Sequence, residues 1–474
     1  MVENHVSEIK FGTDGWRAVI SDKFTFKNVA IVSQAISEWI NKYLKKKEGV
    51  KRVAIGFDTR FLSEEYAKIV ACVLAANRIE AILSNASIPT PALSFGVTRN
   101  HCVAGIMITA SHNPGKFNGI KIKTGLGGAA SREVTNIVEG YLEKTEVKKL
   151  DFQQAVDDRL IVIHDFREDY VRFLRNYLDL KRIRPSKYKV ITDVMHGSGG
   201  TLIKDILKGT NIRCSYMRED VNPTFDGAKP EPVEEYVGDL LKKIKKEKFD
   251  LGLILDGDAD RIAAVTADGE YVSPQKILGL LILHLVRNRN RKGGIVKTIC
   301  GTTMLDNIAA KLNRKLYETP VGFKYISDLM ISEFILIGGE EAGGIGLQNY
   351  IPERDGSLAG LLLLEMMVYQ KKSLKKLIKD MEKEFGRYYY ERLDLEISKK
   401  AFNQDKIKKV KKILNKKVVE IKDFDGIKLI CEDESWLMFR PSGTEPLVRV
   451  YSEATSSTKA KKLIKFGEAL LKKR

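Results

Sequence analysis

The chain has 474 residues, more than one compact core accommodates, so its length predicts several domains. A hydrophobic content of 43% excludes wholesale disorder, and no apolar run approaches the ~20 residues that span a bilayer. The five cysteines are scattered without a Cys-x-x-Cys pair, which excludes a disulfide framework or a cysteine zinc site as the organising principle.

Basic residues outnumber acidic ones, 80 against 62, which gives a formal net charge of +18. The lysines occur in short runs mixed with glutamates, as at 45–47, 242–243, 375–376 and 416–417. This pattern is typical of solvated helix faces, and no basic patch interleaved with aromatics is present, so we expect neither a nucleic-acid nor a membrane partner. Because residues 1–16 lack an apolar signal core, we expect a cytoplasmic protein.

Apolar runs rich in Val and Ile alternate with amphipathic stretches along most of the chain. The run at 53–57 predicts a buried strand, and 64–77 predicts the helix that follows it. Further strands are predicted at 79–83, 104–108, 189–193, 251–255 and 335–338. The alternation of strand and helix predicts α/β domains with largely parallel sheets.

Changes in this pattern of apolar and amphipathic segments predict where the domains begin and end. The amphipathic stretch 165–180 precedes a fresh strand, so we expect domains at 1–159 and 160–262, with a third at 263–386. From about Arg387, lysine-dense helical segments surround short strands at 418–421, 428–431, 436–440 and 447–452. The last unit, 387–474, is therefore expected to be a smaller α+β domain.

The segment TASHNP at 109–114 directly follows the predicted strand 104–108. This position places Ser111 at the carboxyl end of a strand, where α/β proteins bind their ligands. The plainer interpretation is that Ser111 caps a helix. A dyad with His112 is disfavoured, because side chains adjacent in sequence rarely align for proton transfer and no GxSxG elbow is present.

Three aspartates in DGDADR, residues 256–261, follow the strand 251–255. Carboxylates at alternate positions repel one another unless a cation joins them, and hard oxygen ligands suit Mg²⁺ or Ca²⁺. An EF-hand needs Gly at its sixth position and Glu at its twelfth, but Arg261 and Ala267 stand there. The sequence therefore predicts a Mg²⁺ site, and a solvated acidic turn is the alternative.

Three further segments combine glycine with charge. FGTDGWR at 11–17 places Arg17 in a glycine-containing turn, and GGEEAGG at 338–344 places Glu340 after an apolar strand. RPSGTEP at 440–446 combines backbone amides, two hydroxyls and Arg440, with Arg449 further on, which is typical of a phosphate cradle. Each of these also fits an ordinary polar turn.

Taken together and in this order, FGTDGWR, TASHNPGKFNGIK, DGDADR, GEEAGG and RPSGTEP resemble the motifs of the α-D-phosphohexomutase family, from about Lys10 to Ala454. The resemblance implies a four-domain, heart-shaped enzyme. Three related α/β domains with mixed sheets and a smaller C-terminal α+β domain each contribute one motif to a central cleft.

The resemblance also implies roles for individual residues. Ser111 would be the phosphoserine, and its oxygen would bind Mg²⁺ together with Asp256, Asp258 and Asp260. The other residues expected at the reaction centre are Lys121 as general acid/base, Arg17 and Arg261 as lining cations, and His112 beside the phosphoserine. We expect neighbouring Mg²⁺ and arginines to lower the pKa of Lys121. The expected substrate-binding residues are Glu340, Ala342, Lys324, Arg440, Ser442, Gly443, Thr444 and Arg449.

The function that this resemblance implies is phosphoryl transfer within a hexose phosphate. A serine hydroxyl without an adjacent base is a poor nucleophile, which a resident phosphoserine avoids. We expect a phosphoglucomutase that interconverts glucose 1-phosphate and glucose 6-phosphate, acting as a monomer or homodimer, with glucose 1,6-bisphosphate as intermediate and activator. Activity on mannose phosphates is an extension of this expectation. Phosphomannomutase and phosphoglucosamine mutase are the alternatives, and a metal-dependent sugar phosphatase is less favoured. Many family members have Ser where this chain has Ala342, which weakens the assignment of the sugar.

Overall fold

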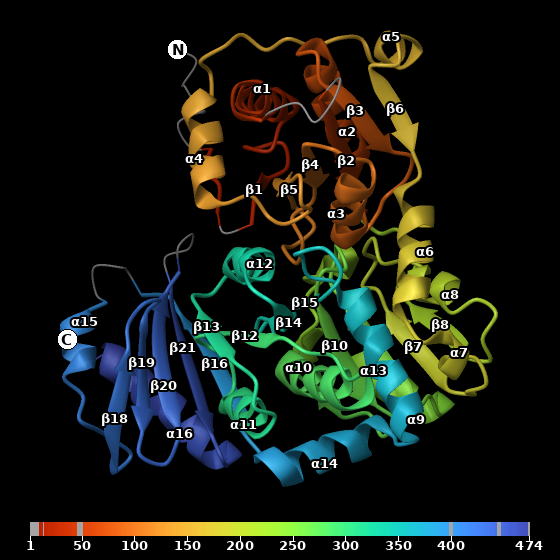
Figure 1. Cartoon of the computed structure of the whole chain (residues 1–474). Helices are drawn as coiled ribbons and strands as arrows, with labels where there is room; N and C mark the ends of the chain where they lie inside the picture. Colours follow the sequence, from red (N-terminus) through yellow and green to blue (C-terminus); the bar gives the residue numbers. More distant parts are fainter. Residues whose placement is uncertain (1–8, 13, 45–50, 398–401, 443–446, 473–474) are drawn as a thin grey trace.

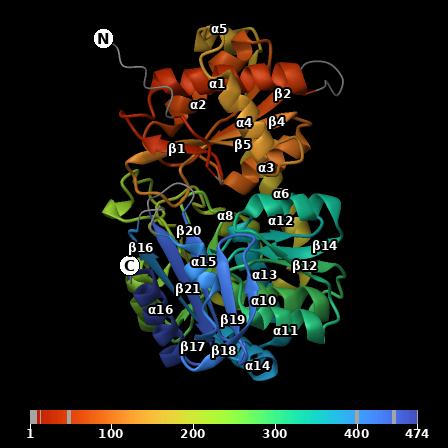
Figure 2. The same ribbon diagram turned by 90° about the vertical axis from the view of Figure 1, so that its left-hand side faces the viewer.

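The computed structural model describes residues 9–12, 14–44, 51–397, 402–442 and 447–472. The chain forms four sheets, each covered by its own helices, and the four units surround a common centre (Figure 1). The first unit lies on one side of this centre, the second and third lie opposite it, and the fourth packs beside the third, as the rotated view also shows (Figure 2).

The first unit is a six-stranded sheet in the order β1-β5-β4-β2-β3-β6. Alternate residues of β2 face opposite sides: Val53 and Ile55 join the core beneath helices α1 and α2, and Ala54 joins the core beneath α3. The strands are β1 (Trp16–Val19), β2 (Arg52–Phe57), β3 (Glu80–Ser84), β4 (Ala104–Ile108), β5 (Phe117–Thr124) and β6 (Ile161–His164). The helices are α1 (Phe26–Tyr43), α2 (Ser63–Ala76), α3 (Thr90–Arg99), α4 (Arg132–Tyr141) and α5 (Phe152–Asp157).

The second unit has a five-stranded sheet in the order β11-β10-β9-β7-β8. Its strands are β7 (Lys189–Asp193), β8 (Arg213–Met217), β9 (Leu251–Leu255), β10 (Ile262–Thr266) and β11 (Tyr271–Val272). Its α-helices are α6 (Phe166–Tyr177), α7 (Leu180–Ile183), α8 (Leu202–Ile206) and α9 (Gly238–Glu247), and two 3₁₀ helices span Phe225–Gly227 and Glu234–Tyr236. Helix α6 packs against α3 and so joins the first unit to the second.

The third unit has a four-stranded sheet in the order β13-β12-β14-β15. Its central helix α13 is buried almost throughout, because its sequence, GSLAGLLLLEMMVYQ, is apolar on every face. The strands are β12 (Gly294–Thr298), β13 (Leu316–Thr319), β14 (Ile335–Gly339) and β15 (Ile345–Leu347). The helices are α10 (Pro274–Leu283, continued by a π-helical turn over His284–Asn288), α11 (Thr303–Lys311), α12 (Phe323–Ser332), α13 (Gly356–Gln370) and α14 (Leu374–Phe385).

The fourth unit is a six-stranded antiparallel sheet in the order β16-β21-β20-β19-β18-β17, with α16 on one face. The strands are β16 (Tyr389–Leu395), β17 (Lys412–Ile413), β18 (Lys416–Lys422), β19 (Ile427–Cys431), β20 (Trp436–Pro441) and β21 (Val448–Ala454). The helices are α15 (Gln404–Lys408) and α16 (Ser457–Lys472). This confirms the predicted smaller α+β domain at the C-terminal end.

The predicted strands are present, and three of them, β4, β7 and β9, have the predicted bounds. The largely parallel sheets predicted from the alternation of strand and helix need a correction, whereas the mixed sheets that the family resemblance implied are confirmed. In each of the first three units, the parallel strands are followed by an antiparallel neighbour: β5 beside β4, β10 beside β9, and β15 beside β14. The sheets are therefore mixed, and a β-hairpin ends each parallel section.

Strand pairing also bears on where one unit ends and the next begins. Strand β6 pairs with β3, so the first unit continues past residue 159, and β10 and β11 extend the second sheet past residue 262. We therefore propose divisions near residues 165, 273 and 387. The first two boundaries predicted from the residue pattern come too early in the chain. The strands that follow them still pair with the preceding sheet.

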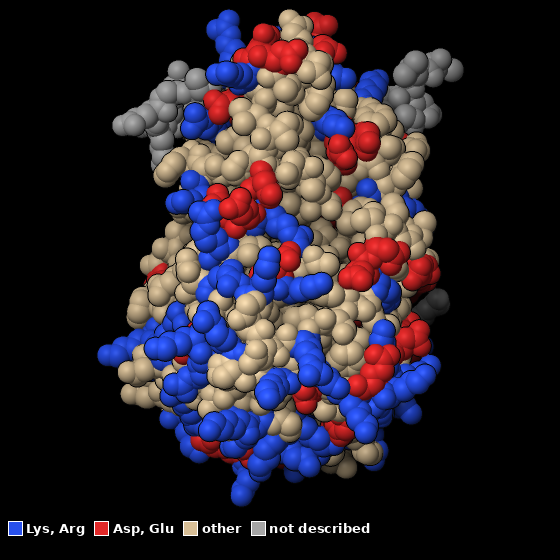
Figure 3. All heavy atoms as spheres, turned by 90° about the vertical axis from the view of Figure 1, so that its right-hand side faces the viewer, with Lys and Arg blue, Asp and Glu red and all other residues tan. Residues whose placement is uncertain are grey.

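Charged side chains cover the face shown in Figure 3 without gathering in one groove. Lysines and arginines dominate its lower half, and acidic side chains are interspersed among them. Within the described part of the chain, every helix is too short or too polar to cross a membrane.

Candidate active site

Three of the sequence motifs lie on the hairpins that end the parallel sections. TASHNP connects β4 to β5, DGDADR connects β9 to β10, and GEEAGG connects β14 to β15. The hairpin after β4 excludes the plainer interpretation of Ser111, because the chain continues into a strand and Ser111 caps no helix. Pairing of β14 with β15 likewise shows that the glycine-rich loop after β14 leads into a strand.

Ser111 is buried and adopts a left-handed backbone conformation, with φ of +53°. Its amide donates to Thr109 Oγ1 at 2.9 Å, and its hydroxyl donates to Asp256 Oδ2 at 3.1 Å. His112 Nδ1 lies 3.4 Å from Ser111 Oγ. The structure thus brings the serine of the first unit against the acidic loop of the second.

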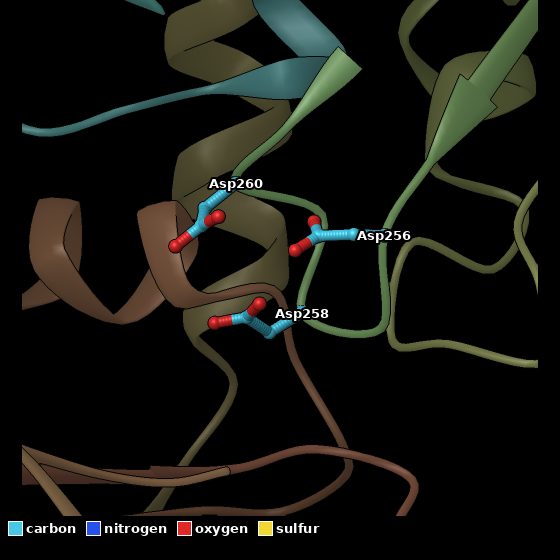
Figure 4. A group of neighbouring side chains, drawn as sticks. All are labelled: Asp256, Asp258 and Asp260. Atoms are coloured by element: carbon cyan, nitrogen blue, oxygen red, sulfur yellow. The ribbon is translucent and has the colours of Figure 1, made fainter. Parts of the chain in front are cut away.

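The side chains of Asp256, Asp258 and Asp260 are fully buried and turn toward one shared space (Figure 4). One ligand oxygen from each lies within 4.8 Å of the others. Asp258 Oδ1 and Asp260 Oδ1 are buried and have no hydrogen-bond donor among the described residues. Because orphaned buried carboxylate oxygens are costly, and because the set is made of hard oxygen donors, these residues fit a Mg²⁺ ion. Burial, together with repulsion from the other two carboxylates, raises the pKa of Asp256 well above its usual range.

Gly257 allows the acidic loop to approach the serine loop. A Cβ at this position would lie 2.6 Å from the carbonyl oxygen of Ser111. Any side chain there would push the two hairpins apart and with them the contact between Ser111 and Asp256.

Lys121, on β5, reaches the acidic loop. Its Nζ lies 2.7 Å from Asp258 Oδ2, 3.0 Å from Asp260 Oδ2 and 2.9 Å from Asp14 Oδ2. Burial by itself disfavours the ammonium, but the three carboxylates outweigh burial and raise the pKa of Lys121. The expected lowering of this pKa by Mg²⁺ and arginines stays a prediction for the metal-bound site, since the nearest charges among the described residues are anions.

Two arginines complete the ring of charge around Ser111. Arg17 Nη1 donates to Asn113 Oδ1 at 2.8 Å, and the guanidinium of Arg261 lies beside Asp260 and Glu231. Burial, assisted by Arg261, Arg17 and Lys121, lowers the pKa of His112 well below its usual value, so this imidazole is neutral.

The glycine-rich loop of the third unit is joined to the acidic loop through backbone pairing of Gly344 with Arg261. Glu340 is buried, which raises the pKa of its carboxyl group, and its Oε2 accepts from Arg354 Nη1 at 3.3 Å. Ala342 is partly exposed at the turn and offers only a methyl group. Lys324, at the start of α12, lines a small pocket that Asp14 and Arg132 also line.

The fourth unit contributes Arg440 and Ser442 at the end of β20, and Arg449 on the neighbouring strand β21. The ends of these strands on this side face the first unit (Figure 1). Arg440 Nε lies 2.9 Å from Asp425 Oδ2, and Arg449 Nε lies 3.6 Å from Asp394 Oδ2. The predicted residues Gly443 and Thr444 lie outside the described residues.

Sequence reasoning missed three charged residues that contact the motifs. Arg354 Nη2 lies 2.5 Å from Asp14 Oδ2 and 2.8 Å from Asp260 Oδ2. Arg60 hydrogen-bonds the backbone around Ser111. A signal for Arg60 was available, because Asp58-Thr59-Arg60 follows β2 as TASHNP follows β4. Asp14 lies inside FGTDGWR and Arg354 lies ten residues after GEEAGG, but nothing in the sequence indicated that the two side chains pair.

Family models for phosphoglucomutase/phosphomannomutase match four successive parts of the chain. The alpha/beta/alpha domains I, II and III match residues 8–149, 168–269 and 273–385, and the C-terminal domain matches 395–466. The crystal structure of a phosphomannomutase candidate from Thermus thermophilus is 31% identical, with a TM-score of 0.87 over 98% of this chain and 99% of that one. The chain belongs to the phosphoglucomutase/phosphomannomutase family.

Members of this family, within the α-D-phosphohexomutase superfamily, are Mg²⁺-dependent isomerases that transfer a phosphoryl group within a hexose phosphate. Relatives with similar sequence identity to this chain are named for different sugar phosphates. A phosphoglucomutase/phosphomannomutase from Thermococcus kodakarensis is 28% identical over 97% of this chain and 98% of its own length. A phosphoglucosamine/phosphogalactosamine mutase from Sulfurisphaera tokodaii is 27% identical over 96% of this chain and 97% of its own.

Proposed function

We propose that this family member interconverts glucose 1-phosphate and glucose 6-phosphate, with Ser111 as the phosphoryl carrier and mannose phosphates as further substrates. The observation that carries the proposal is the contact between Ser111 Oγ and Asp256 Oδ2 at 3.1 Å, beside a buried carboxylate triad and ringed by cations. A hydroxyl held at a cation-binding cluster suits a residue that works in its phosphorylated form.

In the first half-reaction, the bond between Ser111 Oγ and phosphorus breaks as a hydroxyl of the bound hexose monophosphate attacks the phosphorus. The product is a hexose bisphosphate, and the proton of the attacking hydroxyl passes to Lys121 Nζ. Lys121 accepts this proton as the neutral amine, the form that a cation held by Asp256, Asp258 and Asp260 would favour over the ammonium. Reversal of this step with the other phosphate regenerates phosphoserine and releases the isomer. The cleft must exclude water meanwhile, because water would hydrolyse the phosphoserine.

The charged residues have distinct tasks in this proposal. Arg17 and Arg261 neutralise the charge that develops on the transferring group. Asp256, Asp258 and Asp260 would hold Mg²⁺, which when bound polarises the phosphoryl oxygens and offsets their charge. We propose that Arg440, Ser442, Gly443, Thr444 and Arg449 grip the phosphate that is not reacting, and that Lys324 lies near the sugar.

The sugar loop supports a preference for the common hydroxyls of glucose and mannose. Glu340 presents a carboxylate that accepts hydrogen bonds from two neighbouring hydroxyls, and glucose and mannose share equatorial hydroxyls at C3 and C4. Ala342 and Gly344 offer no side-chain donor to the hydroxyl at C2, where the two sugars differ. We therefore expect the phosphates of both glucose and mannose to be turned over.

The decisive experiment follows the mass of the intact protein after incubation with glucose 1,6-bisphosphate. We expect a gain of one phosphoryl group that maps to Ser111, and Ser111→Ala should lose it together with at least ~10³-fold in kcat. Binding of glucose 1-phosphate by Ser111→Ala, measured by calorimetry, should stay within a few-fold of wild type. Unimpaired turnover by this variant contradicts the proposed role.

A panel of substrates tests the choice of sugar and of reaction. Glucose 1-phosphate, mannose 1-phosphate and glucosamine 1-phosphate are each supplied to the wild-type enzyme, and both the 6-phosphate and free phosphate are measured. A preference for glucosamine phosphate overturns the sugar assignment. Stoichiometric release of inorganic phosphate points to a phosphatase.

A further inference from the structure

Arg60 lies directly behind the loop that carries Ser111, at the carboxyl end of β2. Its side chain is completely buried. The guanidinium donates four hydrogen bonds to backbone carbonyl oxygens of that single loop. The acceptors are Ser111 at 2.6 Å, Asn113 at 2.6 Å, Pro114 at 3.0 Å and Phe117 at 3.0 Å.

The orientation of Arg60 is itself fixed from two sides. Its Nε lies 3.2 Å from Asp58 Oδ2, and its guanidinium carbon lies 4.8 Å from the centre of the Phe225 ring, which belongs to the second unit. Asp58 also accepts hydrogen bonds from the hydroxyls of Ser63 and Thr109. The guanidinium is therefore fixed by contacts other than its four hydrogen bonds to the loop.

The same network fixes both peptide groups that flank Ser111. The amide of Ser111 donates to Thr109 Oγ1, which is bound to Asp58, and the carbonyl of Ser111 accepts from Arg60. Left-handed backbone at a non-glycine residue costs on the order of 1 kcal/mol and persists only where its surroundings impose it. Here the imposing groups are Asp58 and Arg60.

We propose that Arg60 is a positioning residue for phosphoryl transfer, an inference that rests on the proposed role of Ser111. By binding four carbonyl oxygens of the loop it keeps Ser111 Oγ against Asp256, and it neutralises oxygens that would otherwise repel the phosphoryl group. Arg60 acts through the loop and contacts neither the sugar nor its phosphates. Its loss should therefore affect the transfer step and leave substrate affinity nearly unchanged.

Arg60→Lys is the informative variant. Lysine keeps the positive charge but has a single nitrogen, which cannot reproduce the planar fork that reaches four carbonyls. Because a displacement of about 1 Å at a reacting group costs ~100-fold in rate, we expect kcat to fall ~100-fold while KM stays within about threefold. Transfer from glucose 1,6-bisphosphate to Ser111, followed by intact mass over time, should slow by the same factor.

Arg175 provides a matched control, because it binds backbone carbonyls far from the reaction centre. Its Nη1 donates to the carbonyls of Asp205, Ile206 and Lys208 at the end of α8. Arg175→Lys should lower the melting temperature and leave kcat and the phosphorylation rate unchanged. A merely structural role for Arg60 predicts that both variants lose activity only as they lose stability.

A second variant covers the case in which Arg60→Lys does not fold. Phe225→Leu removes the ring that covers the guanidinium while leaving its hydrogen bonds, and it should lower kcat several-fold at unchanged KM. The inference is overturned if the variant that folds phosphorylates Ser111 at the wild-type rate, or if its activity loss only matches that of Arg175→Lys at equal melting temperature. Wild-type protein that gains no phosphoryl group at Ser111 overturns the proposed function itself, and the inference with it.

Discussion

Gly344 has no side chain, and this leaves room for the side chain of Arg354. A Cβ at this position would lie 2.2 Å from Arg354 Cδ and 2.8 Å from Glu340 Oε2. Arg354 fills that space and pairs with Asp14, Asp260 and Glu340. The smallest residue of the sugar loop thus lets one guanidinium connect the first, second and third units.

Gly344→Ala should therefore displace Arg354 and lower kcat/KM for glucose 1-phosphate by about 10–100-fold. The physical reason is that Asp260 and Glu340 lose a buried charge partner, which typically costs several kcal/mol. Steady-state kinetics measure the effect. Gly140→Ala, in α4, is the control, because a Cβ there meets no atom within 4 Å, and it should leave kcat/KM unchanged. Wild-type kinetics of Gly344→Ala would contradict the proposed part of Arg354.

At the scale of elements, one device recurs in three units. A buried parallel strand ends, a short polar loop follows, and an antiparallel strand returns beside it: β4 to β5, β9 to β10, and β14 to β15. A hairpin anchors both ends of its loop in two strands that are hydrogen-bonded to each other, so the ends of the loop are fixed relative to one another. Ser111 and the aspartates are therefore presented on rigid supports, as phosphoryl transfer requires.

The contact between β19 and the third unit contains a buried charge. Lys428 donates to the carbonyl of Ile299 at 2.8 Å, and its Nζ lies 4.0 Å from the Trp436 ring centre. Burial, reinforced by Lys297, lowers the pKa of Lys428 to about 8 from 10.5. The folded protein thus binds this proton less tightly than the unfolded chain does. The free-energy cost of burying the Lys428 ammonium is fully present below pH 8. This cost is relieved as pH rises toward 10.5.

We expect the free energy of unfolding of wild type, relative to Lys428→Met, to rise by up to about 3 kcal/mol between pH 8 and 10.5. Chemical denaturation at several pH values measures this difference. Lys422→Met is the control. Burial lowers the pKa of Lys422, but the hydrogen bond to Glu318 outweighs burial and raises it above 10.5, so its effect should be constant over the same window. If the difference in free energy of unfolding between wild type and Lys428→Met does not change with pH, the Lys428 ammonium is not buried at a cost.

At the scale of the whole molecule, three consecutive residues of the third unit bind the first and second units. Glu353 pairs with Lys123 of the first unit, and both side chains are fully buried. Arg354 pairs with Asp14 and Asp260, and Asp355 accepts from the hydroxyl of Tyr170 on α6 at 2.6 Å. This short segment before α13 therefore connects the first, second and third units.

Glu353→Gln should destabilise the protein by about 3–5 kcal/mol, because it leaves the Lys123 ammonium buried without its partner. The free energy of unfolding in denaturant is the measurement. The double variant with Lys123→Met should recover part of the loss, since it removes the unpaired charge. Glu168→Gln, which breaks an exposed pair with Arg172, should cost under about 1 kcal/mol. If Glu353→Gln and Glu168→Gln lowered the free energy of unfolding by the same amount, the proposed cost of the buried, unpaired Lys123 would be contradicted.

Several features of the fold and the site could be predicted from local sequence. Buried strands such as β4 and β9 are continuous apolar runs, and the motifs after them contain the serine and the three aspartates that the structure brings together. Arg60 could not be paired with the Ser111 loop in this way, because 51 or more residues separate them, and 340 residues separate Asp14 from Arg354. The pKa of Lys121 could not be derived from local sequence, because the direction of its shift depends on which charges lie nearest in the fold.

The succession of strands along the chain, the family and the chemical types at the reaction centre were determined by the sequence alone, because periodicity and short motifs are local properties. Only the tertiary structure decided that the functional loops are hairpins, that β6 and β10 belong to the preceding sheets, and that Arg60 and Arg354 reach the motifs. These outcomes depend on hydrogen bonds and charges between distant segments, and such pairings exist only once the chain has folded.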